Sequence, residues 1–397
     1  MDSTVTAIII DSGSSQMKIG LGGEDAPRSA QPNVVGRTRH PGVNPTILGN
    51  ALDNFCGDDA VANEGLLQLN PPVQRGLIVD WDAMEASLHY SFLSSLRVCC
   101  DEHPLCMTES PDCPRMDREK LTQMLFEVFN VPALCISNSS VVGLYSTGRT
   151  TGLVVDSGAG KTHIGPVWEG YSYQHYLQRV DFAGDDVTAE LVKTLRRDGY
   201  PFSTPADFRN AEAIKKELCY LATNAEKELA YCKESRSIER LYALPDGQEI
   251  YMNENRFMLP EMLFSPGALQ CPIPTQGWHT LLFSPGALQC PIPTQGWHTL
   301  IQQSIDQCEL SVRPEMYSNI VLIGGNTLFP RLDERMQKEM SLLSPKGVVA
   351  KCVAFPNRQY GSWVGASILA SMSTFPCMWV SKSEYDDYGA SIIHRKC

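Results

Sequence analysis

The sequence contains two copies of one short pattern, in which Asp-Ser-Gly is followed after five residues by Ile-Gly. The first copy runs from Asp11 to Gly20 and the second from Asp156 to Gly165, and each follows a run of β-branched residues. A strand, a small-residue turn and a second strand predict a β-hairpin whose turn presents backbone N–H groups to phosphate and whose aspartate holds hydrated Mg²⁺. Two such hairpins predict that both halves of the chain grip one polyphosphate.

A single Asp-Ser-Gly after a strand is typical of an ordinary turn, because these residues favour turns. The repetition favours a nucleotide site, and so does a third turn, Gly324-Gly325-Asn326-Thr327, after the apolar segment 320–323. Glycines there allow a flat nucleoside to approach the backbone closely. Residues 158–162 are not a P-loop, because Val155 stands where that motif requires glycine.

The bulk composition narrows the class of protein. A chain of 397 residues, 43% hydrophobic and 20% charged, is long enough for two domains with their own cores. No apolar run approaches the ~18 residues of a membrane span, and the N-terminal segment lacks signal-peptide features, so we expect a cytosolic or nuclear protein. The 14 cysteines contain no C-x-x-C pair and predict free thiols. The net charge of −12 disfavours direct nucleic-acid binding.

The hairpins suggest two related halves, each built on a sheet with flanking helices. Apolar periodicity predicts one helix over 117–130 and another from about 211 to 232. Segments 238–244 and 248–252 flank the turn residues Pro245-Asp-Gly247 and predict a further hairpin.

A tandem duplication interrupts the second half. Residues 263–281 recur without a mismatch as residues 282–300. Each copy carries three prolines, which exclude a long regular element, so we expect 263–300 to form a surface loop. Trp278 and Trp297 cannot both occupy one pocket.

Many short stretches, in order and spacing, are similar to actin and actin-related proteins. They include Ala26-Pro-Arg28, Val35-Gly-Arg37, Gly76 to Glu85, Glu102-His-Pro104, Met107-Thr-Glu109, Gly148 to Gly152, Leu244-Pro-Asp-Gly247, Arg335 to Glu339 and Ser391 to Cys397. The chain therefore resembles a divergent member of this family over nearly its whole length. The likeness fails at about 41–56, where actin carries a loop that inserts into a neighbouring subunit, and at 263–300.

The resemblance implies an α/β fold of the actin-like ATPase type, with two lobes of duplicated βαβ architecture and four subdomains around a nucleotide cleft. It places the first lobe at 1–146, with 33–71 as its second subdomain and 361–397 returning to it. The second lobe, with subdomains 3 and 4, covers 147–360.

The resemblance also implies ATP or ADP with Mg²⁺ or Ca²⁺ as cofactor. Asp11 and Asp156 would hold the metal through water, and His163 would help to position the attacking water. The residues that match the nucleotide contacts are Asp11, Gly13, Ser14, Ser15, Lys18, Asp156, Gly158, Gly160, Gly184, Lys215, Gly324, Gly325, Asn326 and Leu328.

Several positions depart from the family pattern in this pocket. Ser139 stands where actin has the glutamine that orients the hydrolytic water, and Ala159 replaces an acidic residue. Ser15 replaces a glycine, Lys216 stands where a carboxylate would meet the ribose, and Gln359 replaces a lysine near the adenine. Loss of one orienting donor costs on the order of 3 kcal/mol, or ~10²-fold in rate, so we expect weak or absent hydrolysis.

The resemblance further implies an apolar groove for a neighbour's loop or a binding helix. Against assembly, the inserting loop is rewritten at 41–47, the N-terminal acidic cluster is reduced to Asp2, no aromatic follows Cys397, and the duplication falls at actin's cross-strand plug. The residues that match the groove are Tyr145, Gly148, Thr150, Tyr171, Ile368, Leu369, Met372 and Met378.

These features favour a cytoplasmic, cytoskeletal protein that acts mainly by contacts with actin or other cytoskeletal proteins, or by self-association. One alternative is a polymerising ATPase, and another is an actin-related subunit of a larger, nuclear complex. A small-molecule kinase is disfavoured because no sugar-binding segment or catalytic base is recognisable.

Overall fold

The computed structural model describes residues 5–38, 54–267, 295–372 and 375–397. It divides into two compact units, which are treated separately below. The first unit comprises Met1–Thr150, Val167–Gln174 and Tyr360–Cys397, and the second comprises Thr151–Pro166 and His175–Gln359. The rewritten loop at 41–47, Asp2, Trp278 and most of the duplication lie outside the described residues.

The first unit is built on a mixed sheet in the order β19-β10-β9-β1-β2-β3. The first predicted hairpin forms its centre, with β1 and β2 antiparallel, while β9 runs parallel to β1 and β10 runs parallel to β9. The strands are β1 (Ile8–Ser12), β2 (Gln16–Leu21), β3 (Ser29–Pro32), β9 (Leu105–Glu109), β10 (Ala133–Asn138) and β19 (Val380–Ser381).

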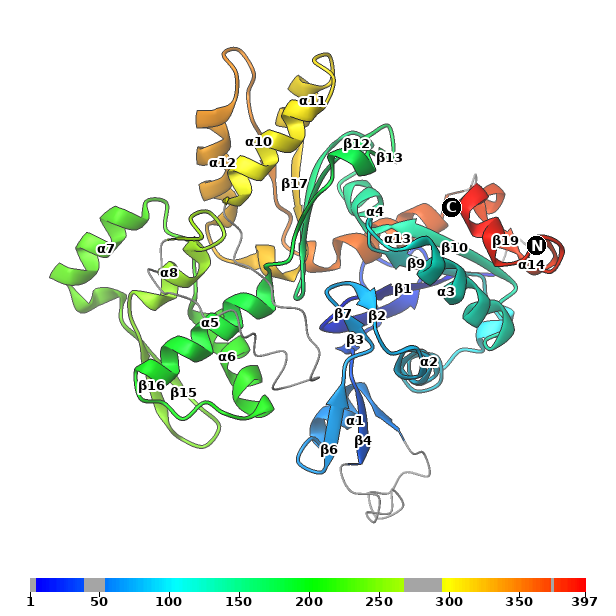
Figure 1. Cartoon of the computed structure of the whole chain (residues 1–397), viewed down its shortest axis with the longest axis horizontal. Coiled ribbons are helices and arrows are strands. Elements are labelled where there is room, and N and C mark those ends of the chain that lie inside the picture. The colour runs from blue at the N-terminus through cyan, green and yellow to red at the C-terminus, as the bar shows by residue number, and fades with distance from the viewer. Residues whose placement is uncertain (1–4, 39–53, 268–294, 373–374) are drawn as a thin grey trace. The chain divides into compact units, whose positions relative to one another are not determined.

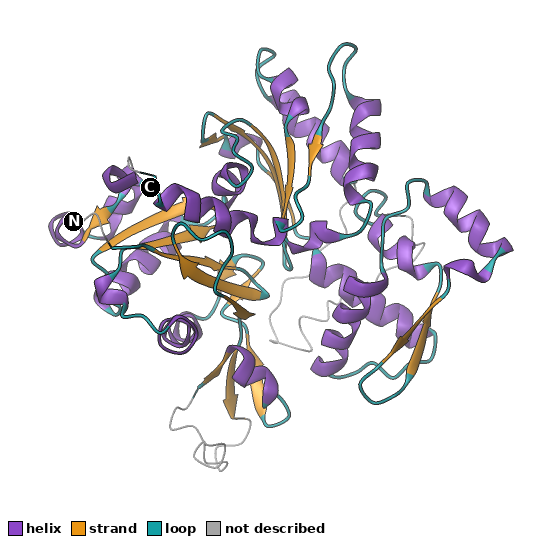
Figure 2. Ribbon diagram, turned by 180° about the vertical axis from the view of Figure 1, so that it is seen from behind, coloured by secondary structure: helices purple, strands orange, loops and turns teal. Residues whose placement is uncertain are grey.

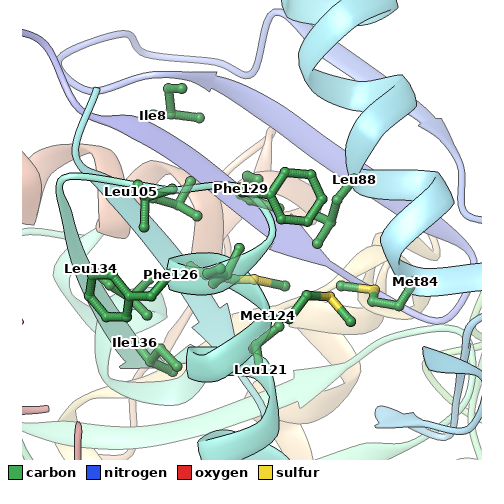
Figure 3. Packing of buried hydrophobic residues seen from close by; sticks show 14 of the residues in the cluster. Ile8, Met84, Leu88, Leu105, Leu121, Met124, Phe126, Phe129, Leu134 and Ile136 are labelled. Atoms are coloured by element: carbon green, nitrogen blue, oxygen red, sulfur yellow. The ribbon is translucent and has the colours of Figure 1, made fainter. Parts of the chain in front are cut away.

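Helices cover both faces of this sheet (Figures 1 and 2). Strand residues alternate between the faces, so Ile8 and Ile10 join one buried cluster while Ile9 joins the other. The first cluster includes side chains of α2 (Trp81–Tyr90) and α3 (Arg115–Glu127), as Figure 3 shows for Met84, Leu88, Leu121 and Phe126. The second cluster includes side chains of α4 (Ser139–Tyr145) and α13 (Gly361–Ala370).

Smaller elements complete the first unit. A three-stranded sheet in the order β5-β4-β6 lies within the segment 33–71 that was expected to form a subdomain of its own. The remaining elements are β4 (Val35–Thr38), β5 (Phe55–Cys56), α1 (Gly57–Ala62), β6 (Leu67–Asn70), β7 (Val73–Gln74), β8 (Leu77–Ile78), η2 (Ser91–Leu96), η3 (Cys100–Glu102), η8 (Phe375–Met378), α14 (Lys382–Tyr388), η9 (Ala390–Ile392) and α15 (Ile393–Lys396).

A second sheet, which includes β11, β14, β17 and β18 of the second unit, repeats this plan. Its order is β13-β12-β11-β17-β18, with β14 also pairing β12. The second predicted hairpin supplies β11 and β12, β17 runs parallel to β11, and β18 runs parallel to β17, as β9 and β10 do beside β1. The strands are β11 (Gly152–Ser157), β12 (Thr162–Trp168), β13 (Tyr171–Ser172), β14 (Gln178–Val180), β17 (Ile320–Ile323) and β18 (Cys352–Val353).

Helices make up most of the rest of the second unit (Figure 2). None of those described, in either unit, is long and apolar enough to cross a membrane. They are η4 (Gln174–Tyr176), α5 (Gly184–Arg197), α6 (Pro205–Leu218), α7 (Ala225–Glu234), η5 (Arg236–Ile238), α8 (Asn255–Glu261), α10 (Trp297–Gln307), α11 (Arg313–Ser318), η6 (Gly325–Leu328), α12 (Leu332–Leu343) and η7 (Arg358–Tyr360). The predicted hairpin around 245–247 is confirmed as β15 (Arg240–Ala243) and β16 (Glu249–Met252).

The single helix predicted over 211–232 is wrong, because the structure has two helices separated at 219–224. In this break Tyr220 N donates to Arg256 O and Leu221 N donates to Pro330 O, so the backbone bonds to other segments instead of to the helix. The Asn224 side chain then accepts from Lys227 N and caps α7.

Three large apolar side chains in the described ends of the duplication are buried, which corrects the expectation of a surface loop at these positions. Leu263 and Phe264 of the first copy are 1% and 2% exposed, and Trp297 of the second copy is 1% exposed. Trp297 N donates to Leu263 O at 2.9 Å. The start of the first copy and the end of the second therefore meet in the hydrophobic core, where Leu263 and Trp297 are both buried.

Candidate functional site

The first hairpin places an ion pair at the end of β1. Asp11 and Lys18 lie opposite each other in the β1–β2 register, and Lys18 Nζ donates to Asp11 Oδ2 at 2.6 Å. The other carboxylate oxygen accepts from Thr108 Oγ1, also at 2.6 Å. Burial raises the pKa of Asp11, but the charge of Lys18 and these hydrogen bonds outweigh burial and lower the pKa below its ordinary value. Asp11 is therefore held as a carboxylate at neutral pH.

The fully buried side chain of Asn33 stabilises the turn between β1 and β2 by hydrogen bonds. Asn33 Nδ2 donates to Gly13 O at 2.8 Å and to Ser12 Oγ at 3.1 Å, and Asn33 Oδ1 accepts from Ser87 Oγ of α2. Asn33 N donates to Ser15 O. These bonds fix the turn that contains Gly13, Ser14 and Ser15. The sequence analysis did not predict Asn33 and Thr108 as site residues, because neither belongs to the repeated pattern.

Ser14 is also anchored, since its hydroxyl accepts from Gly76 N at 3.1 Å. Ser139 lies in the same unit, at the start of α4 and directly after β10. The strand registers align Asp11 with Thr108 and Thr108 with Ser137, so Ser139 follows the same end of the parallel strands that carries Asp11. The carboxyl ends of parallel strands are where α/β proteins place their ligands.

The second hairpin is fastened to its neighbours by hydroxyl groups. Ser157 Oγ and Thr162 Oγ1 lie 2.7 Å apart across the turn, and Thr162 Oγ1 also donates to Phe182 O. Asn326 Nδ2 donates to Ser157 Oγ at 3.0 Å. Gly158 N donates to Lys161 O and closes the turn that contains Gly160. The hairpin and the third glycine turn therefore lie side by side in the second unit.

Gly324 requires glycine for two reasons. Its φ is +90°, and a Cβ there would lie 2.2 Å from Ser157 O. The adjoining Gly325 differs, because a Cβ there would meet no atom within 4 Å. The turn thus combines a tight backbone contact at Gly324 with open space at Gly325. Leu328 ends the same short helical turn and is half-buried.

Gly184 and Lys215 form a second polar junction in this unit. Gly184, at the start of α5, donates its N–H to Gly158 O at 3.1 Å, and Asp185 N donates to Ala159 O. Lys215 Nζ donates to Gly184 O and Thr188 Oγ1, both at 2.7 Å. Burial lowers the pKa of Lys215. Lys215 of α6 therefore anchors the start of α5, whose own backbone N–H groups bond to the second hairpin turn.

Asp156 and His163 lie on the hairpin strands. Asp156 is near the end of β11, in register with Ile323, and His163 is on β12, in register with Arg179 and 3% exposed. The structure therefore places Asp156, Gly158, Gly184, Asn326 and His163 in the second unit, while Asp11, Lys18 and Ser139 belong to the first.

The residues of the second unit fit a ligand that donates hydrogen bonds. Asn326 Oδ1 is buried and accepts no hydrogen bond within the described residues. Buried acceptors normally have a partner, so a ligand hydroxyl or amine suits this position. Open space surrounds Gly325, and a Cβ at Gly158 would find its nearest atom only at 3.9 Å.

Three residues that depart from the family pattern, Ala159, Lys216 and Gln359, differ in how far they are exposed to solvent. Lys216 is exposed and pairs with Glu212, one helical turn earlier, at 2.7 Å. Ala159 and Gln359 are half-buried. Arg358, beside Gln359, donates to Thr327 O at 2.7 Å and so ties this segment to the third glycine turn.

The family model described as Actin matches residues 2–397. The chain belongs to the actin family. Members of the actin family generally bind an adenine nucleotide with a divalent cation. The resemblance suggested by the short sequence stretches is thereby confirmed, and so is the actin-like α/β fold.

The eight residues expected to line the groove all belong to the first unit, and we call them the docking residues. Tyr171, Ile368, Met372 and Met378 are large apolar side chains with exposed fractions of 77%, 44%, 50% and 41%. Tyr145 is half-buried, and its hydroxyl occupies the space where Gly170 would carry a Cβ. Burial and the adjacent Tyr171 raise the pKa of Tyr145.

Proposed function

We propose that the protein binds ATP or ADP with Mg²⁺ or Ca²⁺ mainly as a structural ligand, hydrolyses it weakly, and acts chiefly through protein contacts. The observation that carries this proposal is Ser139, whose short hydroxyl follows β10 at the strand end that also carries Asp11. A hydroxyl there is too short to hold water where a glutamine amide would.

The binding side of the proposal rests on the hairpin geometry. Asp11 is a fixed carboxylate suited to hydrated cations, and we assign the same role to Asp156. We assign the glycine turn at 324–325 and Asn326 to the nucleoside. The bound cation would neutralise phosphate charge. Lys18 and the backbone N–H groups of the two turns would orient the phosphates, and His163 would orient water.

Phosphate release tests the hydrolysis half of the proposal. The double variant Ser139→Gln with Ala159→Asp should release phosphate ~10²-fold faster than the unmodified protein, because it restores an orienting amide and a carboxylate. Nucleotide affinity, measured on the same samples by titration calorimetry, should change little. An unmodified protein as fast as conventional actin in polymerising salt would refute weak hydrolysis.

Nucleotide binding has its own test. Mg-ATP at millimolar concentration should raise the unfolding temperature, since a ligand that binds only the folded state stabilises it. Asp156→Ala should reduce this shift. Absence of both heat and stabilisation would contradict binding, whatever the rate of hydrolysis.

The exposed docking residues favour protein contacts and keep a polymerising ATPase as the second candidate function. Cytoplasmic location with the cytoskeleton, and actin or a second copy of this chain as partner, follow as proposals. Pelleting with and without actin separates the two functions. Sedimentation alone, with phosphate release, indicates a filament subunit, whereas sedimentation only with actin indicates an accessory protein.

A further inference from the structure

Two cysteines that are distant in sequence meet on one face of the first unit's sheet. Cys135 lies in β10, and Cys397 directly follows α15. The Cys397 thiol donates to Cys135 Sγ with the sulfur atoms 3.6 Å apart, across a separation of 262 residues. Both are free thiols. The pair is not used by the candidate nucleotide site.

The two thiols differ in their access to solvent. Cys135 is 1% exposed and packs in the apolar cluster with Ala133, Phe375 and Trp379. Cys397 is half-buried at the edge of this cluster.

Cys397 is held in place by its neighbours. Arg118 of α3 donates to Cys397 O at 3.1 Å, and Lys396 Nζ donates to Trp379 O at 2.9 Å. These two bonds anchor residues 396 and 397 to α3 and to Trp379.

We propose that Cys135 and Cys397 are a modification site, at which a low-molecular-weight disulfide such as glutathione disulfide converts the two thiols into a reversible intramolecular disulfide. The sulfur atoms already touch, and they must approach by about 1.5 Å to reach the ~2.05 Å of a disulfide bond. The partly exposed Cys397 is the entry point, and the buried Cys135 is the resolving thiol.

The chemistry is a thiol–disulfide exchange in two steps. Deprotonated Cys397 attacks one sulfur of glutathione disulfide, the S–S bond breaks, and one glutathione thiolate leaves. Deprotonated Cys135 then attacks Cys397 Sγ, and the second glutathione thiolate leaves. The two protein thiols lose two protons and two electrons in total, and glutathione disulfide is reduced to two glutathione thiols.

The surroundings make this reaction slow at neutral pH. The shared hydrogen bond and burial raise the pKa of Cys397, and the hydrogen bond with Cys106 of β9 and burial raise that of Cys135. Arg118 of α3, itself paired with Glu109 of β9, opposes the shift at Cys397. Because the thiolate is the nucleophile, the rate should rise as pH increases from 7 to 9.

Oxidation should also reach the docking residues. Met378 O lies 3.8 Å from Cys397 Sγ and is a second acceptor for the single proton of this thiol, and a disulfide sulfur has no proton to donate. Met378 is exposed and belongs to the docking residues. Formation of the disulfide therefore removes the donor for this contact with one of the docking residues.

Mass spectrometry of the full chain tests the proposal. The reduced protein is incubated with glutathione disulfide at pH 7 and pH 8.5, free thiols are alkylated, and the protein is digested without reductant. We expect a peptide pair linked through Cys135 and Cys397, formed at least severalfold faster at pH 8.5. The linked protein should unfold at a higher denaturant concentration than the reduced protein.

Matched variants assign the bond. Cys397→Ser should abolish the linked pair, whereas Cys377→Ser, which removes an exposed cysteine nearby, should leave its yield unchanged. Glutathione attached to Cys397 while Cys135 remains alkylatable at pH 8.5 would overturn the proposal. Modification confined to exposed cysteines such as Cys99 would also overturn it.

Discussion

At the scale of single residues, the polar atoms around the first turn are satisfied by a few side-chain hydrogen bonds. The Asn33 side chain makes hydrogen bonds with Gly13 O, Ser12 Oγ and Ser87 Oγ. Thr108 donates a hydrogen bond to the Asp11 carboxylate. A buried group that loses its partner costs more than the hydrogen bond itself contributes. Substitution of Asn33 or Thr108 should therefore lower the stability of the fold more directly than it changes nucleotide hydrolysis.

Asn33→Ala should lower the free energy of unfolding by about 2–4 kcal/mol, because it leaves the buried Ser87 hydroxyl and Gly13 carbonyl without their partner. Urea denaturation measures the change. Asn63→Ala on α1 is the control, since its side chain makes one exposed hydrogen bond to Asp59 O, and it should stay within about 0.5 kcal/mol. Equal losses in both variants would contradict the role given to Asn33.

Asp11 should make stability depend on pH in the acid range. Its folded pKa lies below its unfolded value of 3.8, so the ionised form favours the folded state. This contribution is complete above pH 3.8 and is lost as the pH falls through the folded pKa. Urea denaturation between pH 7 and pH 3 should therefore measure a difference in free energy of unfolding between the unmodified protein and Asp11→Asn. This difference should be constant near neutral pH and should become smaller as the pH falls toward 3. A difference that grows on acidification would refute this assignment. So would the same pH dependence in the control variant Asp25→Asn, whose side chain is exposed.

At the scale of elements, two neighbouring glycines should respond in opposite ways. Gly324→Ala should cost several kcal/mol of stability, because its Cβ would collide with Ser157 O and its φ is positive. Gly325→Ala should fold normally, since its Cβ meets open space. If the nucleoside occupies that space, Gly325→Ala should instead weaken binding of ATP. Thermal unfolding and calorimetric titration of both variants distinguish these effects.

At the scale of the whole molecule, the duplication should be dispensable for folding. Deleting 282–300 places Trp278 to Leu281 directly before Ile301, so an identical sequence takes the place of Trp297 to Leu300. The shortened connection changes the closure entropy by only about 0.6 kcal/mol per halving of its length. We expect stability within about 1–2 kcal/mol of the full chain, with altered self-association.

Calorimetry and sedimentation of the deletion variant provide the measurement. Trp297→Ala in the full chain is the contrasting variant, because truncation of this buried indole should cost about 3–5 kcal/mol. Trp278→Ala should lower the free energy of unfolding by less, since Trp297 is the indole that lies beside Leu263 in the core. Failure of the deletion variant to fold would show that both copies are required.

The sequence by itself determined the features that depend on short spacing. The two Asp-Ser-Gly hairpins and the strand before Gly324 follow from β-branched runs that end in small polar residues, because strand pattern and turn chemistry are local. The repeat also indicated two related sheets, and both sheets place a parallel strand beside the first strand of the hairpin. The family followed from short stretches spread along the chain.

Only the tertiary structure decided which distant side chains meet. The break between α6 and α7 arises because Tyr220 and Leu221 bond to backbone far along the chain, which helical periodicity does not record. Asn33 accepts a hydrogen bond from Ser87, 54 residues away, and Cys397 contacts Cys135, 262 residues away, because packing of the first unit brings them together. The duplication has two identical copies, so no sequence rule could select between them. Burial selects the start of one copy and the end of the other, because together they fill a single core position.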